Sequence, residues 1–208
     1  MKHYAMMMLL TGAGLMTACG SAGFIGNNAG QPDNHSDNAA QTEQASVETT
    51  FPEKTELPDL LDFTAKTLDG KVFTAADFAA ADVTVINIWS TTCGPCIHEI
   101  PNIASYAASL PDNVQVMTWC LDAEVSPDAD KITGFLADCG FDGVTLTSGD
   151  GDMQSLYSSL RYTPTTVFVD STGKMVSEPI IGAVDIKTIY TEHINAALET
   201  LGKDKITV

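Results

Sequence analysis

One apolar run, residues 83–89 (VTVINIW), constrains the fold of this 208-residue chain more than any other segment. A strand with one face in water alternates apolar and polar residues, but this run is almost continuously apolar and β-branched. It therefore predicts a central strand buried on both faces. A helical stretch follows at residues 96–110, so the short segment between them joins a buried strand to the start of a helix.

Further strands and helices alternate through residues 57–208. The turn signal Leu68-Asp69-Gly70 predicts a hairpin between residues 61–65 and 71–74. Apolar patterning predicts the remaining elements, which are strands at 114–120, 144–147, 165–170 and 175–181 and helices at 127–139, 152–160 and 185–201. This alternation predicts an α/β sandwich whose central sheet has mixed strand direction.

The amino-terminal 56 residues have a different composition. Residues 1–18 contain one lysine, a short apolar run and then small residues, which is the order of a secretory signal peptide. The apolar run is shorter than the about 20 residues that span a bilayer. Residues 19–56 are polar and lack apolar periodicity, so we expect a flexible acidic tether between the signal and the folded domain.

Cys19 directly follows Leu15-Met16-Thr17-Ala18, a sequence that resembles a bacterial lipobox. The resemblance implies cleavage before Cys19, lipidation of its thiol and a lipid anchor in the bacterial cell membrane. The alternative is an ordinary signal peptide or an uncleaved anchor in which this cysteine is incidental. Either interpretation places the folded domain outside the cytoplasm.

The charge balance excludes one class of partner. The chain has 27 acidic and 10 basic side chains, a formal net charge of −17. A general nucleic-acid binder needs clustered Lys and Arg to displace counterions from phosphates, and the sequence has no such cluster. We therefore expect no nucleic-acid partner.

The chemistry is concentrated in Cys93-Gly94-Pro95-Cys96, at the junction of strand and helix. Two cysteines at this spacing can close a small disulfide. Unpaired N–H groups and the positive end of the helix dipole favour the thiolate of Cys93, the attacking species in thiol–disulfide exchange. Cys93 is thus the predicted nucleophile and Cys96 the resolving thiol.

A metal site is the alternative interpretation of this pair. Zinc would need two further ligands, and Cys120 and Cys139 do not form a second close pair. A copper-delivery or other metal-binding lipoprotein would also use Cys93 and Cys96. His98 lies two residues after Cys96, about 200° around a helix, so we expect it on the helix surface and not in such a site.

The segment IWSTTCGPC, preceded by an apolar strand, resembles the active site of thioredoxin-fold proteins, and most closely the membrane-tethered thiol–disulfide oxidoreductases of the TlpA/ResA type. The resemblance covers about residues 57–201. It implies a thioredoxin-like three-layer sandwich, with a mixed central sheet flanked by helices and an N-terminal β-hairpin extension. It also implies that Trp89, Gly94 and Pro95 support the redox pair, and Pro101 matches the proline inside the active-site helix.

The resemblance extends to a second loop. Thr163-Pro164 matches the cis-proline loop, which lies against the disulfide and presents its backbone to substrates. Gly182 also has a counterpart in the family. Two positions depart from thioredoxin: Asn87 replaces the buried aspartate, which favours the extracytoplasmic subfamily, and Thr92 replaces a tryptophan before the first cysteine, which leaves the choice of partner open.

What the resemblance implies about function is a lipid-anchored enzyme that reduces disulfides in partner proteins without a cofactor. Gly94-Pro95 is the dipeptide of reducing thioredoxin, but this dipeptide leaves a disulfide oxidase or isomerase open. Apocytochrome c and a methionine sulfoxide reductase are both substrates of the family type. A membrane thiol electron donor would re-reduce the pair.

The two remaining cysteines suggest a second disulfide. With Cys19 lipidated and the redox pair joined, Cys120 and Cys139 are left over in an oxidising compartment. We predict a structural disulfide between them, with two buried free thiols as the alternative.

Glu99 is the predicted proton-handling group of the redox pair. Cys96 must lose a proton before it can attack, and Asn87 cannot accept one. Glu99 lies three residues after Cys96, on the same helix face, and a glutamate at this spacing borders the active site in TlpA/ResA-type proteins. The alternative is a solvated glutamate in the first turn of the helix.

Overall fold

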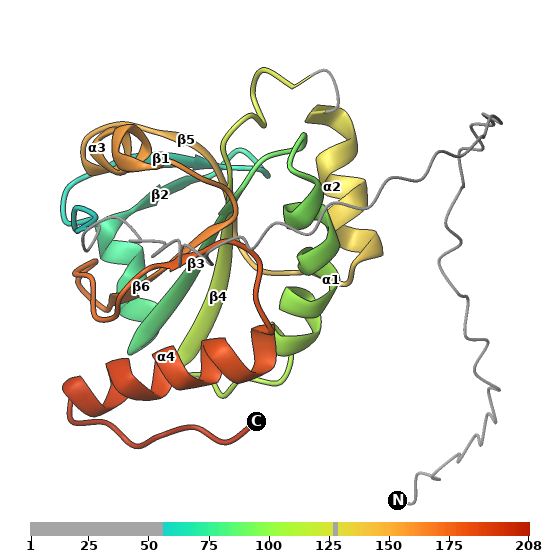
Figure 1. Ribbon diagram of the computed structural model, residues 1–208. Coiled ribbons are helices and arrows are strands. Elements are labelled where there is room, and N and C mark those ends of the chain that lie inside the picture. Colours follow the sequence, from blue (N-terminus) through green and yellow to red (C-terminus); the bar gives the residue numbers. More distant parts are fainter. Residues whose placement is uncertain (1–55, 127–128) are drawn as a thin grey trace, which may run out of the picture. The chain divides into compact units, whose positions relative to one another are not determined.

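The computed structural model describes residues 56–126 and 129–208 (Figure 1), so Cys19, the predicted signal peptide and nearly all of the predicted tether lie outside the described residues. The sheet has seven strands in the order β2-β1-β5-β4-β3-β6-β7. Their bounds are Thr64–Thr67 (β1), Val72–Thr74 (β2), Val83–Trp89 (β3), Val114–Cys120 (β4), Thr145–Gly149 (β5), Thr165–Asp170 (β6) and Ile180–Ile181 (β7). The helices are the 3₁₀ helix η1 (Ala75–Ala80) and the α-helices α1 (Gly94–Ala107), α2 (Ala129–Asp138), α3 (Asp152–Ser159) and α4 (Ile186–Thr200).

Strand direction in the sheet is mixed, as the sequence predicted. The strands β3, β4 and β5 are parallel, whereas β6 runs antiparallel to β3 and β1 runs antiparallel to β5. The β1–β2 hairpin is the expected N-terminal extension. Because parallel strands end at the same edge of a sheet, the carboxyl ends of β3 and β4 lie together, and the first residue of β6 lies beside them.

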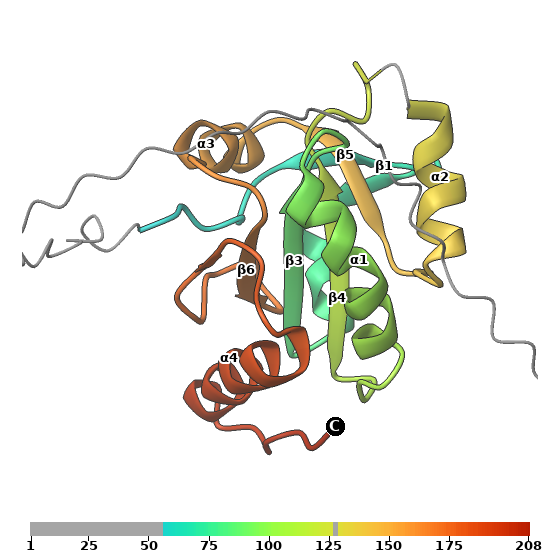
Figure 2. The ribbon, with the colours of Figure 1, turned by 45° about the vertical axis from the view of Figure 1, so that its right-hand side comes forward.

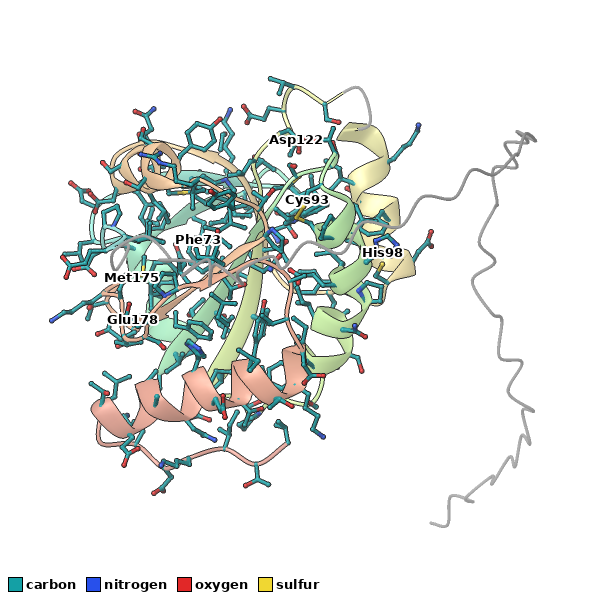
Figure 3. The ribbon with its side chains drawn as sticks, viewed as in Figure 1. Phe73, Cys93, His98, Asp122, Met175 and Glu178 are labelled. Atoms are coloured by element: carbon teal, nitrogen blue, oxygen red, sulfur yellow. A yellow bond between two sulfur atoms is a disulfide. The ribbon has the colours of Figure 1, made fainter. Side chains whose placement is uncertain are left out.

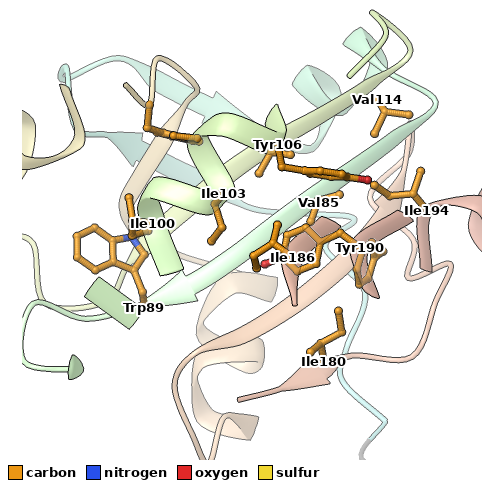
Figure 4. Packing of buried hydrophobic residues seen from close by; sticks show 14 of the residues in the cluster. Val85, Trp89, Ile100, Ile103, Tyr106, Val114, Ile180, Ile186, Tyr190 and Ile194 are labelled. Carbon is orange, nitrogen blue, oxygen red and sulfur yellow. The ribbon is translucent and has the colours of Figure 1, made fainter. Parts of the chain in front are cut away.

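The burial of β3 explains why its sequence is almost continuously apolar. All seven residues are buried. Val83, Val85 and Trp89 face a core shared with α1, α2 and α4, whereas Ile86 and Ile88 face a second core that η1 and α3 cover. Figures 2 and 4 show α1 and α4 packed on the first face. The predicted three-layer α/β sandwich is confirmed. No helix within the described ranges is both long and apolar enough to cross a membrane.

Two segments differ from the sequence prediction. The predicted strand over residues 175–181 is reduced to Ile180–Ile181 and one bridge between Met175 and Val169. Pro179 has no N–H group to donate to a strand ladder, so pairing cannot run through this segment. The 3₁₀ helix Ala75–Ala80, which the sequence analysis did not predict, begins where Asp77 accepts hydrogen bonds from the backbone and hydroxyl of Thr74.

The predicted disulfide between Cys120 and Cys139 is wrong for this structure. Cys120 is a buried thiol that donates to Asp122, at 3.4 Å, and the disulfide of the described residues joins Cys93 to Cys96. The reason is topological. A helix between parallel strands runs antiparallel to them, so Cys139, just after α2, lies near the edge of the sheet opposite the end of β4. The ten residues of α2 are about 15 Å long, and the chain covers this distance from one edge of the sheet toward the other.

One contact joins the amino-terminal part of the domain to the turn after β6. Gly173 has a φ of +90°, and its carbonyl oxygen accepts a hydrogen bond from the Leu60 N–H at 2.8 Å. A Cβ atom at position 173 would overlap the Leu60 carbonyl oxygen. This close approach requires a glycine, both for the backbone conformation and for space.

We predict that Gly173→Ala lowers the free energy of unfolding by about 3 kcal/mol, from the left-handed conformation and the steric overlap together. Gly70→Ala is the matched control, because Gly70 has a φ of +80° with no atom within 4 Å of the added Cβ. This control substitution should lower the free energy of unfolding by only about 1 kcal/mol. Urea denaturation of both variants measures the difference, and equal losses would contradict the close contact with Leu60.

Candidate active site

The redox pair lies where β3 ends and α1 begins, as the sequence predicted (Figure 3). Cys93 caps α1, and its sulfur accepts a hydrogen bond from the Cys96 N–H at 3.3 Å. The two cysteines form a disulfide with a Cα–Cα distance of 5.3 Å. Cys93 is half-buried, whereas Cys96 is completely buried, so a partner can reach only the first sulfur.

The segment around the pair accounts for this geometry. Pro95 occupies the first turn of α1, where its missing N–H costs no hydrogen bond. Trp89 is fully buried and packs against Phe135 of α2, with ring centroids 6.0 Å apart, which fixes the end of β3. Gly94 and Thr92 are exposed beside Cys93.

Other predicted positions on α1 lie as expected. The helix continues through Pro101. His98 is exposed, and its ring nitrogen Nδ1 lies 2.7 Å from the Gly94 carbonyl oxygen on the same helix, as predicted for a surface residue.

The second predicted loop lies at the same edge of the sheet. The Thr163–Pro164 peptide bond is cis, as the family resemblance implied. Pro164 is buried, and its carbonyl oxygen accepts a hydrogen bond from the Gly182 N–H at 2.8 Å. The next residue, Thr165, pairs with Ile88, one residue before the end of β3. The pairing of β6 with β3 therefore brings the proline loop and the redox pair to one edge.

Glu99 is a buried carboxyl on the face of α1 that meets the sheet. Its side chain is 6% exposed, and the Asn87 amide donates to its Oε1 at 2.8 Å. Burial raises the pKa of Glu99 to about 7, because desolvation outweighs the hydrogen bond from Asn87, which lowers it. At neutral pH this group can both accept and return a proton.

Two residues that the sequence analysis did not single out complete this buried network. The Asn87 amide also lies 3.2 Å from the Thr166 hydroxyl and 3.3 Å from the Tyr190 hydroxyl, and these two hydroxyls are 2.8 Å apart. Burial raises the pKa of Tyr190 well above its usual range. The only sequence signal for Tyr190 was its apolar helical spacing with Ile186 and Ile194, which indicates burial but not a polar partner.

Comparison with known proteins agrees with this geometry. The Redoxin family model matches residues 48–184. The thiol:disulfide interchange protein HelX of Rhodobacter capsulatus is 27% identical over 107 residues, which are 50% of this chain and 56% of that protein. The chain thus spans little more than half the length of this relative.

Two solved structures show the same fold. The first is a thiol:disulfide interchange protein of the thioredoxin family from Chlorobium tepidum, with a TM-score of 0.52 and 18% sequence identity. The alignment covers 67% of this chain and 97% of that protein's chain. The second is the exposed lipoprotein thioredoxin of Streptococcus pneumoniae, with a TM-score of 0.52 and 21% sequence identity. The alignment covers 64% of this chain and 98% of that protein's chain. The matched family model, this fold and the Cys93–Cys96 disulfide agree, and the chain belongs to the Redoxin family with a thioredoxin-like fold.

Proposed function

We propose that this protein is an extracytoplasmic, membrane-tethered enzyme that reduces disulfides of partner proteins through Cys93 and Cys96. The observation that carries the proposal is the unequal burial of the two sulfurs: Cys93 is accessible at the start of α1, and Cys96 is enclosed behind it. In such a pair the accessible sulfur attacks the partner and the enclosed sulfur releases it.

The reaction has two exchange steps. The Cys93 thiolate attacks a partner disulfide, forms a mixed disulfide with one partner sulfur and releases the other as a thiolate. Cys96 then loses its proton and attacks the Cys93 sulfur, which releases the second partner thiolate. The partner gains two electrons, and the Cys93–Cys96 pair becomes a disulfide, which a membrane thiol donor would reduce again.

Glu99 suits the second step as the proton acceptor of Cys96. It lies one helical turn after Cys96 on α1, and its pKa of about 7 matches the working pH of a general base. An ionised Glu99 also disfavours thiolates at the pair. Strong oxidants have a stabilised reduced form, so a carboxylate here favours the reducing direction over the oxidase alternative.

The tether is inferred from the composition of residues 19–56, and the partners are those that the family resemblance implies. Lipidation at Cys19 would hold the domain at the membrane through residues 20–56, within reach of a membrane electron donor. The partners are protein disulfides, with apocytochrome c and a methionine sulfoxide reductase as the two family-type substrates. The loop of Thr163 and cis-Pro164, beside the end of β3, would present its backbone to the bound substrate. Thr163 would make the backbone contact, because Pro164 has no N–H and its carbonyl oxygen already accepts from the Gly182 N–H.

The reducing direction has a measurable consequence. We predict that the isolated domain catalyses insulin reduction and equilibrates with glutathione at a potential near that of thioredoxin, about −270 mV. Tryptophan fluorescence of the domain, or the fraction of the cysteine pair that can be alkylated, measures this potential across a series of glutathione buffers. A value near −120 mV, the range of strong oxidants, would contradict the proposed direction.

Two variants test whether Cys93 is the nucleophile and Cys96 the resolving thiol. Cys96→Ser cannot resolve the mixed disulfide, so it should retain partner proteins through Cys93 in complexes that dithiothreitol releases. Cys93→Ser is the matched control and should retain none. Equal trapping by both variants would contradict the assignment, and trapping by Cys93→Ser alone would reverse the nucleophile and the resolving thiol.

We predict that Glu99→Gln slows disulfide reduction at pH 7 by about 100-fold, because the proton acceptor is lost while the amide can still accept from Asn87. Removal of the negative charge should also lower the pKa of the Cys93 thiol, so iodoacetamide should alkylate Cys93 at lower pH than in the wild type. An unchanged rate and an unchanged alkylation profile would leave Glu99 as a structural residue.

Stability gives an independent check on the Glu99 variant. Burial raises the pKa of Glu99 from 4.5 to about 7, so the folded state holds a proton that the unfolded state releases between these values. This contribution to stability is complete below pH 4.5 and is lost as the pH rises through 7. Relative to Glu99→Gln, the wild type should therefore lose on the order of 2 kcal/mol across this window. Chemical denaturation at pH 4.5 and 8 measures the loss.

Lipidation makes a separate prediction. Cys19→Ala should release the domain from membranes or leave an unprocessed precursor, because the lipid is attached through one thiol. Cell fractionation followed by mass spectrometry of the amino terminus measures both outcomes. The anchor proposal fails if the wild-type protein carries no lipid and the variant fractionates identically.

A further inference from the structure

A half-buried carboxylate outside the predicted site binds the loop that carries Cys93. Asp122 follows the end of β4, and its two oxygens accept hydrogen bonds from the Thr91 N–H at 2.9 and 3.2 Å. The Thr91 hydroxyl donates to Oδ2 at 2.6 Å and lies 2.9 Å from the Ser126 hydroxyl. Asp122 thus joins the loop after β3 to the loop after β4.

These contacts lie at the redox pair. Trp89 and Cys120, the last residues of β3 and β4, are paired in the sheet, and the Leu121 N–H donates to the Trp89 carbonyl oxygen at 2.9 Å. Only Thr92 separates Thr91 from Cys93. Figure 3 shows Asp122 and Cys93 at the same end of the domain.

The carboxylate of Asp122 is charged in this environment. Partial burial raises its pKa, but the hydrogen bonds from the Thr91 hydroxyl and N–H more than compensate, so the pKa lies below its usual value. The Cys120 thiol donates to Oδ1 at 3.4 Å, and burial raises the pKa of this thiol to about 12. The groups that these contacts bring to Asp122 are therefore neutral donors.

We propose that Asp122 is a positioning residue for Cys93: through Thr91 it holds the loop before the nucleophile in place and favours the disulfide form of the Cys93–Cys96 pair. The inference rests on the redox role of this pair, which the proposed function shares.

Two physical effects act in the same direction. In the disulfide form the sulfur–sulfur bond itself holds Cys93 near Cys96, but in the dithiol form only non-covalent contacts do so. The bonds to Asp122 keep the loop ordered after reduction, and so reduce the entropy lost when the disulfide closes again. A fixed negative charge near the start of α1 also opposes the thiolate that the helix dipole favours.

The experiment compares Asp122→Ala with the wild type in equilibrium with glutathione. We expect the equilibrium constant for forming the disulfide to fall about tenfold, which corresponds to a rise of about 30 mV in the reduction potential of a two-electron couple. The pH at which Cys93 is half-alkylated should fall as well. Asp122→Asn, which removes the charge but keeps one oxygen acceptor for the Thr91 N–H, should reproduce the shift in alkylation with a smaller change in the equilibrium constant.

Thr91→Val tests the hydroxyl alone. It retains the carboxylate and the backbone hydrogen bonds, so it should lower the equilibrium constant about twofold to threefold without a shift in the Cys93 alkylation profile. If Asp122→Ala does not fold, Asp122→Asn combined with Thr91→Val takes its place, and the combined loss should exceed that of either single variant.

Asp170→Asn is the matched control. Asp170 accepts from the N–H and the hydroxyl of Thr172 at 2.8 and 2.7 Å, the same chemistry, but it pairs with Val83 at the start of β3. Six residues of strand, about 20 Å, separate that position from Trp89. This variant should leave the equilibrium constant and the alkylation profile unchanged.

The inference is overturned if a folded Asp122→Ala variant has the same Cys93 alkylation profile as the wild type and an equilibrium constant within twofold of it. It is also overturned if Asp170→Asn changes the equilibrium constant and the alkylation profile as much as Asp122→Ala does. The proposed function has a different failure: a wild-type domain that does not reduce insulin. The glutathione equilibrium can be measured in either case, so the two results are separable.

Discussion

The position of every group in the site follows from the pairing of β3 with β4 on one side and with β6 on the other. Parallel pairing with β4 puts the end of that strand, and so Asp122, beside the end of β3. Antiparallel pairing with β6 puts Pro164 at the same edge. Cys93, the cis-proline loop and Asp122, to which we assign the roles of nucleophile, substrate loop and positioning residue, come from three distant parts of the sequence. The hydrogen-bond ladders on the two sides of β3 align them.

Burial acts on the two sides of the redox pair in opposite ways. Behind it, Glu99 is enclosed by the α1 face of the sheet, and desolvation keeps its pKa near 7, where proton transfer is useful. Beside it, Asp122 is less deeply buried, and strong donors from Thr91 keep its pKa low, so that it remains a fixed charge. The pKa values of these two carboxyl groups thus shift in opposite directions, because Glu99 accepts from a single donor and Asp122 from several.

Much of the site was predictable because it is local in the sequence. The spacing of Cys93 and Cys96 at a strand–helix junction places both sulfurs in one helical turn, and Glu99 is one turn further on, whatever the rest of the fold does. Asp122 and Tyr190 were not predictable in the same way. Thr91, which binds Asp122, is 31 residues away from it in the sequence, and Asn87, which binds Tyr190, is 103 residues away, so no local pattern indicates either contact.

The buried strand over residues 83–89 and the redox pair at its end could be predicted from the sequence alone, because periodicity and capping act within a few residues. Which other residues lie beside that pair depends on how the strands and helices pack. Cys120 and Cys139 were the natural disulfide partners by counting, yet α2 carries Cys139 toward the opposite edge of the sheet while Cys120 donates to Asp122. Long-range contacts depend on strand order and helix direction, which are properties of the whole packed sheet and of no single segment.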